Sequence, residues 1–192
     1  SFDRRLTKKE FTMPQLKDWL ILSNNPSVTK VVPDDQTHSY DLFNYTDNEA
    51  LRYGQRTWGV NLVWGDPAKT DNVRFQRQSG SKEPLKFDEP IAINLKGGGF
   101  LVYQKRDKGI NLGWSQAPKF EWKISGGDAG SEVPANQLIG LHNNVENDSV
   151  MYEERSWGIN LKWFKDSGKY NEVNEAIRAG KAGVDLLKVI FG

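Results

Sequence analysis

Cysteine is absent from the 192 residues, and histidine occurs only twice, at His38 and His142. Without thiols the chain can form no disulfide, no thiolate metal site and no cysteine nucleophile. Two histidines without cysteine also fall short of the usual zinc sites. A glycine-rich phosphate loop and a nucleophile elbow are missing too. We therefore predict no catalytic residue, no metal ligand and no cofactor, and we expect a binding protein rather than an enzyme.

Long apolar runs and an excess of one charge are missing as well. No window of about 18 apolar residues occurs, which argues against a membrane-spanning helix. Lysine and arginine number 26, aspartate and glutamate 25, and the net charge is +1. This balance gives no electrostatic reason to expect a nucleic-acid partner. The compartment stays open, with secretion as the preferred interpretation.

What the chain does contain is a threefold repeat rich in aromatic residues. Seven Trp, six Tyr, nine Phe and 18 Gly are typical of a turn-rich all-β protein. The segments 51–64, 101–114 and 150–163 align without gaps, at steps of 50 and 49 residues. Six positions are identical in all three copies: a Tyr, an Arg, a Gly, an Asn, a Leu and a Trp. Such a period indicates one supersecondary unit used three times.

Each copy predicts a β-hairpin whose turn contains glycine, and short apolar strands flank the hairpins. These strands are predicted at 40–44, 73–76, 91–94, 120–124 and 138–141. The third unit lacks a downstream strand, and 28–32 is predicted to supply it. Three four-stranded units resemble the β-trefoil superfamily, in the architecture of ricin-B-type lectins but without their Gln-x-Trp signature. The resemblance implies an all-β β-trefoil in which this N-terminal strand closes the third repeat.

We expect three regions along the chain. Residues 1–26 are expected to form an N-terminal extension that packs on the domain. The β-trefoil is predicted to span 27–168, with repeats at about 40–80, 90–127 and 137–168. Residues 169–192 have apolar side chains near helical spacing and predict a C-terminal helical segment. Its apolar end, 186–191, suggests contact with a membrane or a partner.

The candidate ligand-binding residues are the repeated Arg and Asn, with the residue at the tip of each turn. They are Arg56, Trp58, Asn61, Arg106, Lys108, Asn111, Arg155, Trp157 and Asn160. An aromatic ring can stack on the apolar face of a sugar while Asn and Arg bond its hydroxyls. Structural alternatives stay open, since Asn or Arg could bond the backbone of its own turn and Trp could cover a neighbouring loop.

These residues predict a carbohydrate-binding, lectin-like module, with the targeting part of a toxin or defence protein as one setting for it. The expected partners are glycans or a glycosylated receptor. Trefoils also serve as inhibitors and as receptor-binding domains of toxins, so a protein-binding module is an alternative. A membrane-active protein that uses the C-terminal apolar helix is the third.

Overall fold

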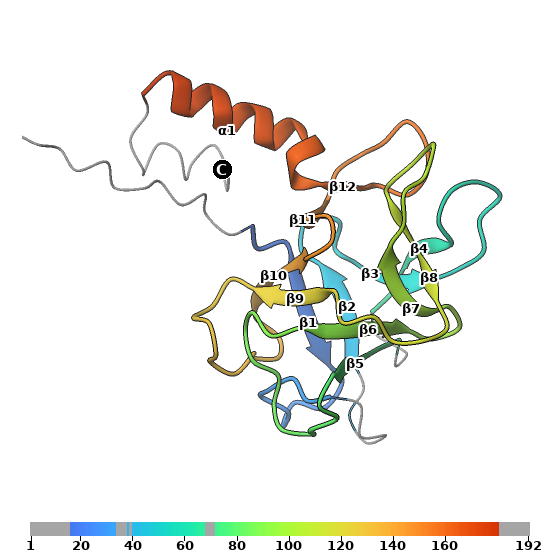
Figure 1. Ribbon diagram of the computed structural model, residues 1–192, viewed down its shortest axis with the longest axis vertical. Helices are drawn as coiled ribbons and strands as arrows, with labels where there is room; N and C mark the ends of the chain where they lie inside the picture. Colours follow the sequence, from blue (N-terminus) through green and yellow to red (C-terminus); the bar gives the residue numbers. More distant parts are fainter. Residues whose placement is uncertain (1–15, 34–37, 39, 68–71, 181–192) are drawn as a thin grey trace, which may run out of the picture.

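The computed structural model describes residues 16–33, 38, 40–67 and 72–180. These residues form twelve strands, one 3-10 helix and one α-helix (Figure 1). The elements are β1 (Trp19–Ser23), β2 (Tyr40–Asn44), β3 (Glu49–Tyr53), β4 (Leu62–Gly65), β5 (Val73–Arg77), β6 (Ile91–Leu95), β7 (Gly99–Tyr103), β8 (Leu112–Ser115), β9 (Trp122–Ser125), β10 (Leu138–Asn143), β11 (Asp148–Tyr152), β12 (Leu161–Trp163), η1 (Phe164–Asp166) and α1 (Gly168–Arg178).

Six of these strands close a barrel. β1 pairs with β2, β2 with β5, β5 with β6, β6 with β9, β9 with β10, and β10 again with β1, and every pair is antiparallel. Alternate side chains fill the interior, as the two-residue period of a strand requires. In β1, Trp19 and Ile21 are fully buried, and in β5 the same is true of Val73 and Phe75. The other strands pair outside the barrel as the hairpins β3–β4, β7–β8 and β11–β12.

The structure confirms the all-β class but corrects the predicted architecture. It shows a closed six-stranded antiparallel barrel with extra strands and a short α-helix, and it does not show a β-trefoil. The segment 28–32, predicted as the closing strand, makes only an isolated bridge between Lys30 and Pro134. Thr29 and Lys30 are both exposed, so this segment has no alternating buried face. The barrel is closed instead by Trp19–Ser23, which was predicted to belong to an extension outside it.

The strands predicted around the hairpins are present. Those expected at 40–44, 73–76, 91–94, 120–124 and 138–141 correspond to β2, β5, β6, β9 and β10. The helix predicted in the C-terminal segment is present as α1. Residues 181–192, which include 186–191, lie outside the described residues. Among the described residues, no helix is both long and apolar enough to cross a membrane.

The repeated tyrosines and tryptophans join the three hairpins in a ring. Each hairpin supplies a Tyr to the next hairpin and a Trp to the previous one. The pairs are Tyr53–Trp114, Tyr103–Trp163 and Tyr152–Trp64, with ring centroids 5.4, 6.4 and 5.8 Å apart. An aromatic pair of this kind adds about 0.5–1.5 kcal/mol beyond the area that it buries. Two of the six identical positions are thus explained by contacts between copies.

Two carboxylates, one buried and one half-buried, tie two hairpins to the barrel. Asp18, directly before β1, accepts hydrogen bonds from the side chain of Asn44 (2.9 Å) and the backbone N–H of Tyr152 (2.8 Å). Glu121 stands in the same place before β9. It accepts from the backbone N–H of Tyr103 and from the side chain of Asn143 (3.2 Å). Each carboxylate therefore links an asparagine side chain of the barrel to a backbone N–H of a hairpin.

Replacing Asp18 by alanine should lower the free energy of unfolding by about 2–3 kcal/mol, because the donors of Asn44, Thr46 and Tyr152 lose their acceptor. Urea titration followed by tryptophan fluorescence measures the change. Asp128, whose side chain is exposed, provides the control. Asp128→Ala should stay within about 0.5 kcal/mol of the wild type. If Asp18→Ala cost no more than this control, the proposed link between barrel and hairpin would be wrong.

His142, in β10, should make the stability depend on pH. Its burial, and then the charge of Lys123, lower the pKa of the imidazole below its ordinary value of 6.5. The unfolded chain therefore binds this proton more tightly than the folded protein does. The free energy of unfolding should fall as the pH drops below about 6.5, and His142→Gln should remove this part of the fall. Urea midpoints measured for both proteins between about pH 7.5 and 5.5 would refute this if the two curves ran parallel.

Candidate functional site

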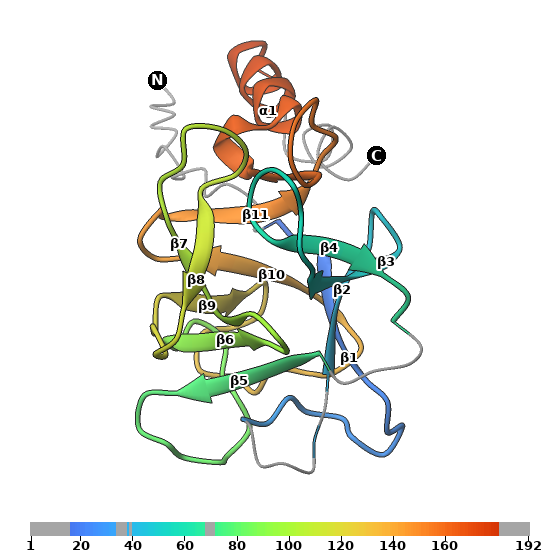
Figure 2. The same ribbon diagram turned by 90° about the vertical axis from the view of Figure 1, so that its right-hand side faces the viewer.

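The loops of the three hairpins meet on one side of the molecule. Hairpin loop 1 is 54–61, hairpin loop 2 is 104–111 and hairpin loop 3 is 153–160. Figure 2 shows all three at the same end of the structure. A Cβ added at Gly158 would lie 3.6 Å from the Cα of Gly109, and one added at Gly59 would lie 3.7 Å from the Cα of Gly158. What the sequence presents as three separate candidate sites is therefore one continuous surface.

The close approach of the three loops requires glycine at the repeated position. Gly59, Gly109 and Gly158 have φ angles of +84°, +81° and +80°. A residue with a Cβ is strained at such positive φ angles, whereas glycine adopts them without strain. The absent side chain also leaves room for the ring of Trp157, which would lie 3.2 Å from a Cβ at Gly109 and 3.5 Å from one at Gly59.

The repeated asparagine shapes each loop. Its Oδ1 accepts a hydrogen bond from the backbone N–H of the repeated arginine five residues earlier. The pairs are Asn61–Arg56 at 3.0 Å, Asn111–Arg106 at 2.8 Å and Asn160–Arg155 at 2.9 Å. Each asparagine is the last residue of its loop, directly before the second strand of the hairpin. The structural alternative for these residues is confirmed, and a direct role in binding stays a prediction.

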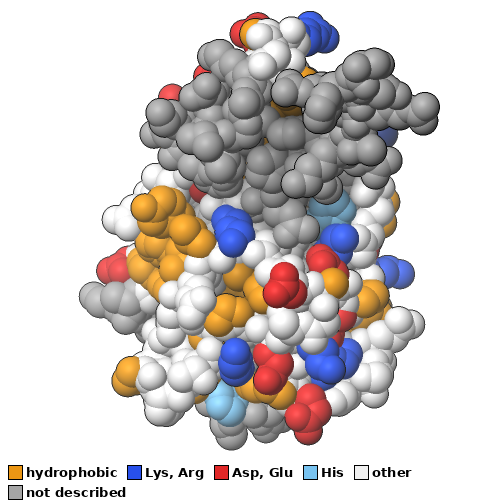
Figure 3. Space-filling model, turned by 90° about the vertical axis from the view of Figure 1, so that its left-hand side faces the viewer, with side chains coloured by type: hydrophobic (Ala, Val, Ile, Leu, Met, Phe, Trp, Pro, Cys, Tyr) orange, Lys and Arg blue, Asp and Glu red, His pale blue; other side chains and the backbone are white. Residues whose placement is uncertain are grey.

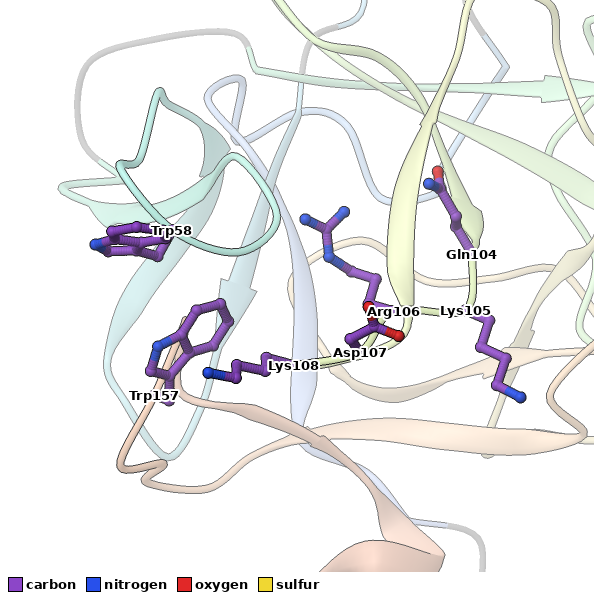
Figure 4. A pocket seen from close by; sticks show the side chains of 7 residues that line it. All are labelled: Trp58, Gln104, Lys105, Arg106, Asp107, Lys108 and Trp157. Carbon is purple, nitrogen blue, oxygen red and sulfur yellow. The ribbon is translucent and has the colours of Figure 1, made fainter.

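The repeated arginines divide into two groups. Nη1 of Arg56 donates to the carbonyl of Leu62 at 3.4 Å, and Nη1 of Arg155 donates to the carbonyl of Leu161 at 3.3 Å. These two arginines therefore brace their own loops. The guanidinium of Arg106 has no hydrogen-bond or ion-pair partner within the described part of the chain. It faces an open hollow instead (Figure 4).

The two turn tryptophans differ in exposure. Trp58 is 68 % exposed, which no requirement of the core explains. Trp157 is half-buried against the glycines of the other two loops, so for this residue the alternative of covering a neighbouring loop is confirmed. Its ring also lies 5.9 Å from Nζ of Lys108, a cation–π contact. Loops 1 and 3 thus supply aromatic rings, and loop 2 supplies a cation.

An open hollow of about 690 Å³ lies between these loops. It is lined by Trp58, Gln104, Lys105, Arg106, Asp107, Lys108 and Trp157. Figure 4 shows the two indole rings together on one side and the polar side chains of hairpin loop 2 on the other. A second hollow, of about 610 Å³, is lined by Gln55, Arg56, Thr57, Trp58, Val63, Ser156, Trp157 and Gly158. Because both hollows share Trp58 and Trp157, the two tryptophans stand between two adjoining recesses.

The predicted site residues are therefore only partly brought together. Trp58, Arg106, Lys108 and Trp157 line one hollow, while the asparagines serve the loops. The repeat pattern missed Gln104, Lys105 and Asp107, because they differ between the copies. The signal that could have found them is the run Lys105-Arg-Asp-Lys108, in which all four residues are charged, whereas the aligned runs are Gln55-Arg-Thr-Trp58 and Glu154-Arg-Ser-Trp157.

Tyr152 and Asp47 connect hairpin loop 3 to the β2–β3 turn. Burial raises the pKa of the Tyr152 hydroxyl above 10.0, while a hydrogen bond with Asn160 acts in the opposite direction. Burial also raises the pKa of Asp47 above 3.8, a hydrogen bond with Tyr152 opposes this, and the charge of Asp18 adds to the rise. These groups connect the β2–β3 turn to the loop without entering the hollow.

Gly109→Ala should destabilise the protein more than Gly80→Ala. Both glycines have positive φ, +81° and +74°, so each alanine would carry about 1–2 kcal/mol of backbone strain. Only the methyl at position 109 would press on the Trp157 ring, since nothing lies within 4 Å of a Cβ at Gly80. Urea unfolding measures both losses. Equal losses would contradict the close approach of hairpin loops 2 and 3.

Figure 3 shows the face of the molecule on the left-hand side of Figure 1. Basic and acidic side chains lie next to each other there (Figure 3). Within the described ranges, no cluster of three or more His, Asp or Glu side chains could hold a metal ion.

The comparisons with protein-family models, curated proteins and solved structures found no match to this chain. The site's own chemistry must therefore carry the functional inference.

Proposed function

We propose that this protein binds carbohydrate in the hollow between the hairpin loops. The observation that carries the proposal is Trp58, a large aromatic side chain that is 68 % exposed beside a second indole, Trp157. A sugar ring offers an apolar face that stacks on such a ring. Covering an aromatic side chain removes apolar area from water, at roughly 25 cal/mol per Å². A sugar stacked on Trp58 would thus remove from water the apolar area that this side chain exposes in the folded protein.

The polar lining suits the rest of a sugar. Gln104 offers both donors and an acceptor, Asp107 offers acceptors, and Arg106 and Lys108 offer donors. Ligand sites commonly combine an apolar wall with a few polar groups that set orientation and specificity. Figure 4 shows Lys108 reaching toward Trp157, with Arg106 and Asp107 behind it on the same loop.

The proposed site is a single one. Three independent shallow pockets would give weak sites a gain from multivalency. The contacts among Gly59, Gly109 and Gly158 instead merge the three turns, and each loop contributes different side chains to the hollow. We therefore expect one glycan per domain. A toxin or defence setting stays a prediction, and the membrane-active alternative depends on residues that the structure does not describe.

A glycan array on the wild type, Trp58→Ala and Tyr45→Ala tests the proposal. Tyr45 is 62 % exposed and lines neither hollow, so it is a matched aromatic control. Losing a stacking partner should weaken binding of the best glycan by about tenfold or more. Tyr45→Ala should bind like the wild type. If no glycan bound the wild type, or if a protein partner bound it without competition from sugars, the proposal would be wrong.

A further inference from the structure

Building on the proposed carbohydrate site, we propose that its ligand is an acidic oligosaccharide. In this arrangement Arg106 and Lys108 bind a carboxylate or sulfate group of the sugar chain. The sugar rings lie against Trp58 and Trp157. Hairpin loop 2 is then the loop that decides which glycan is bound, and loops 1 and 3 supply the stacking surface.

The first observation is that the guanidinium of Arg106 has no hydrogen-bond or ion-pair partner in the described part of the chain. Arg is identical in the three copies, yet only Arg56 and Arg155 use their guanidinium to bond the first carbonyl of the strand that follows their loop. Arg106 is partly buried and has no acceptor among the described residues. A guanidinium without an acceptor is available to an anion, and a charge-assisted hydrogen bond to an anion is stronger than a bond between neutral groups. Arg also presents a planar fork that matches a carboxylate or a sulfate.

The local charge is the second observation. Lys105, Arg106 and Lys108 line the first hollow against a single acid, Asp107. The chain as a whole has a net charge of only +1, so this excess is a property of the site. The cation–π contact with Trp157 holds Nζ of Lys108 near the indole ring. An acidic group on a sugar stacked at the tryptophans would thus meet a cation already in place.

The size of the recess indicates an oligosaccharide rather than a single sugar. The hollows of about 690 Å³ and about 610 Å³ lie on either side of the pair Trp58 and Trp157. A chain of several sugars could cross both tryptophans with one end near Arg106. A monosaccharide could occupy only one of the two recesses.

Matched glycan pairs test this inference by isothermal titration. The probes are a galacturonate hexamer and its methyl ester, a sialylated oligosaccharide and its asialo form, and a sulfated chondroitin oligosaccharide and its desulfated form. In at least one pair, the acidic member should bind about tenfold more tightly or better. The pair that responds shows whether a carboxylate or a sulfate is recognised. Added salt should weaken the acidic member selectively.

Arg106→Gln and Lys108→Gln should each weaken binding of the acidic member far more than binding of the neutral member, so that most of the preference for the acidic member is lost. Lys119→Gln is the control, because Lys119 is exposed and lines neither hollow. Thermal unfolding verifies that the variants are folded. If neutral members bound as tightly as acidic ones, this inference would fail while the carbohydrate proposal stood. If no glycan on the array or in these pairs bound, both would fail. Displacement of a glycan by single-stranded DNA at similar affinity would assign the cations to nucleic acid and overturn the inference.

Discussion

The cyclic contact between tyrosines and tryptophans is the interaction on which the site depends. Three Tyr–Trp pairs link each hairpin to the next, and two of the tryptophans also reach inward. Trp64 stacks on Trp19 and Trp163 stacks on Trp122, each pair with ring centroids 6.1 Å apart. The barrel tryptophans in turn donate to hairpin carbonyls, Trp19 to Val150 at 2.9 Å and Trp122 to Leu101 at 2.8 Å. The hairpins are thereby fixed relative to the barrel, and their loops have one place to meet.

This constraint divides the residues of the repeat by role. Residues that are identical in the three copies mostly build the scaffold: the Tyr and Trp join the hairpins, the Gly lets the loops touch and the Asn shapes each loop. Residues that differ between copies are free to make a site. Trp58 and Trp157 face Lys108, and Gln104 and Asp107 occur only in the second copy. A threefold scaffold thus carries an asymmetric surface, as a single specific ligand requires.

The sequence predicts the local part of this structure well. Strand alternation and repeated turns identify the hairpins and the five strands around them, because these signals lie within a few residues of each other. Barrel closure is a long-range pairing between β1 and β10, more than a hundred residues apart. The run Trp19 to Leu22 is apolar throughout, so its periodicity does not distinguish a strand from a helix. The sequence pattern therefore favours 28–32, wrongly, as the closing strand. The difference between Arg106 and its two counterparts could not be predicted either, since all three arginines are identical in type and position in the repeat.

The central claim is that one ligand binds where the three hairpin loops meet. The most direct measurement follows the indole N–H signals of the seven tryptophans by NMR while the best array glycan is added. Binding should saturate at one glycan per domain and cause large shifts for Trp58 and Trp157. The signals of Trp19 and Trp122, which lie in the core, should stay nearly unchanged. Shifts that leave Trp58 and Trp157 unaffected, or saturation at three glycans per domain, would contradict it.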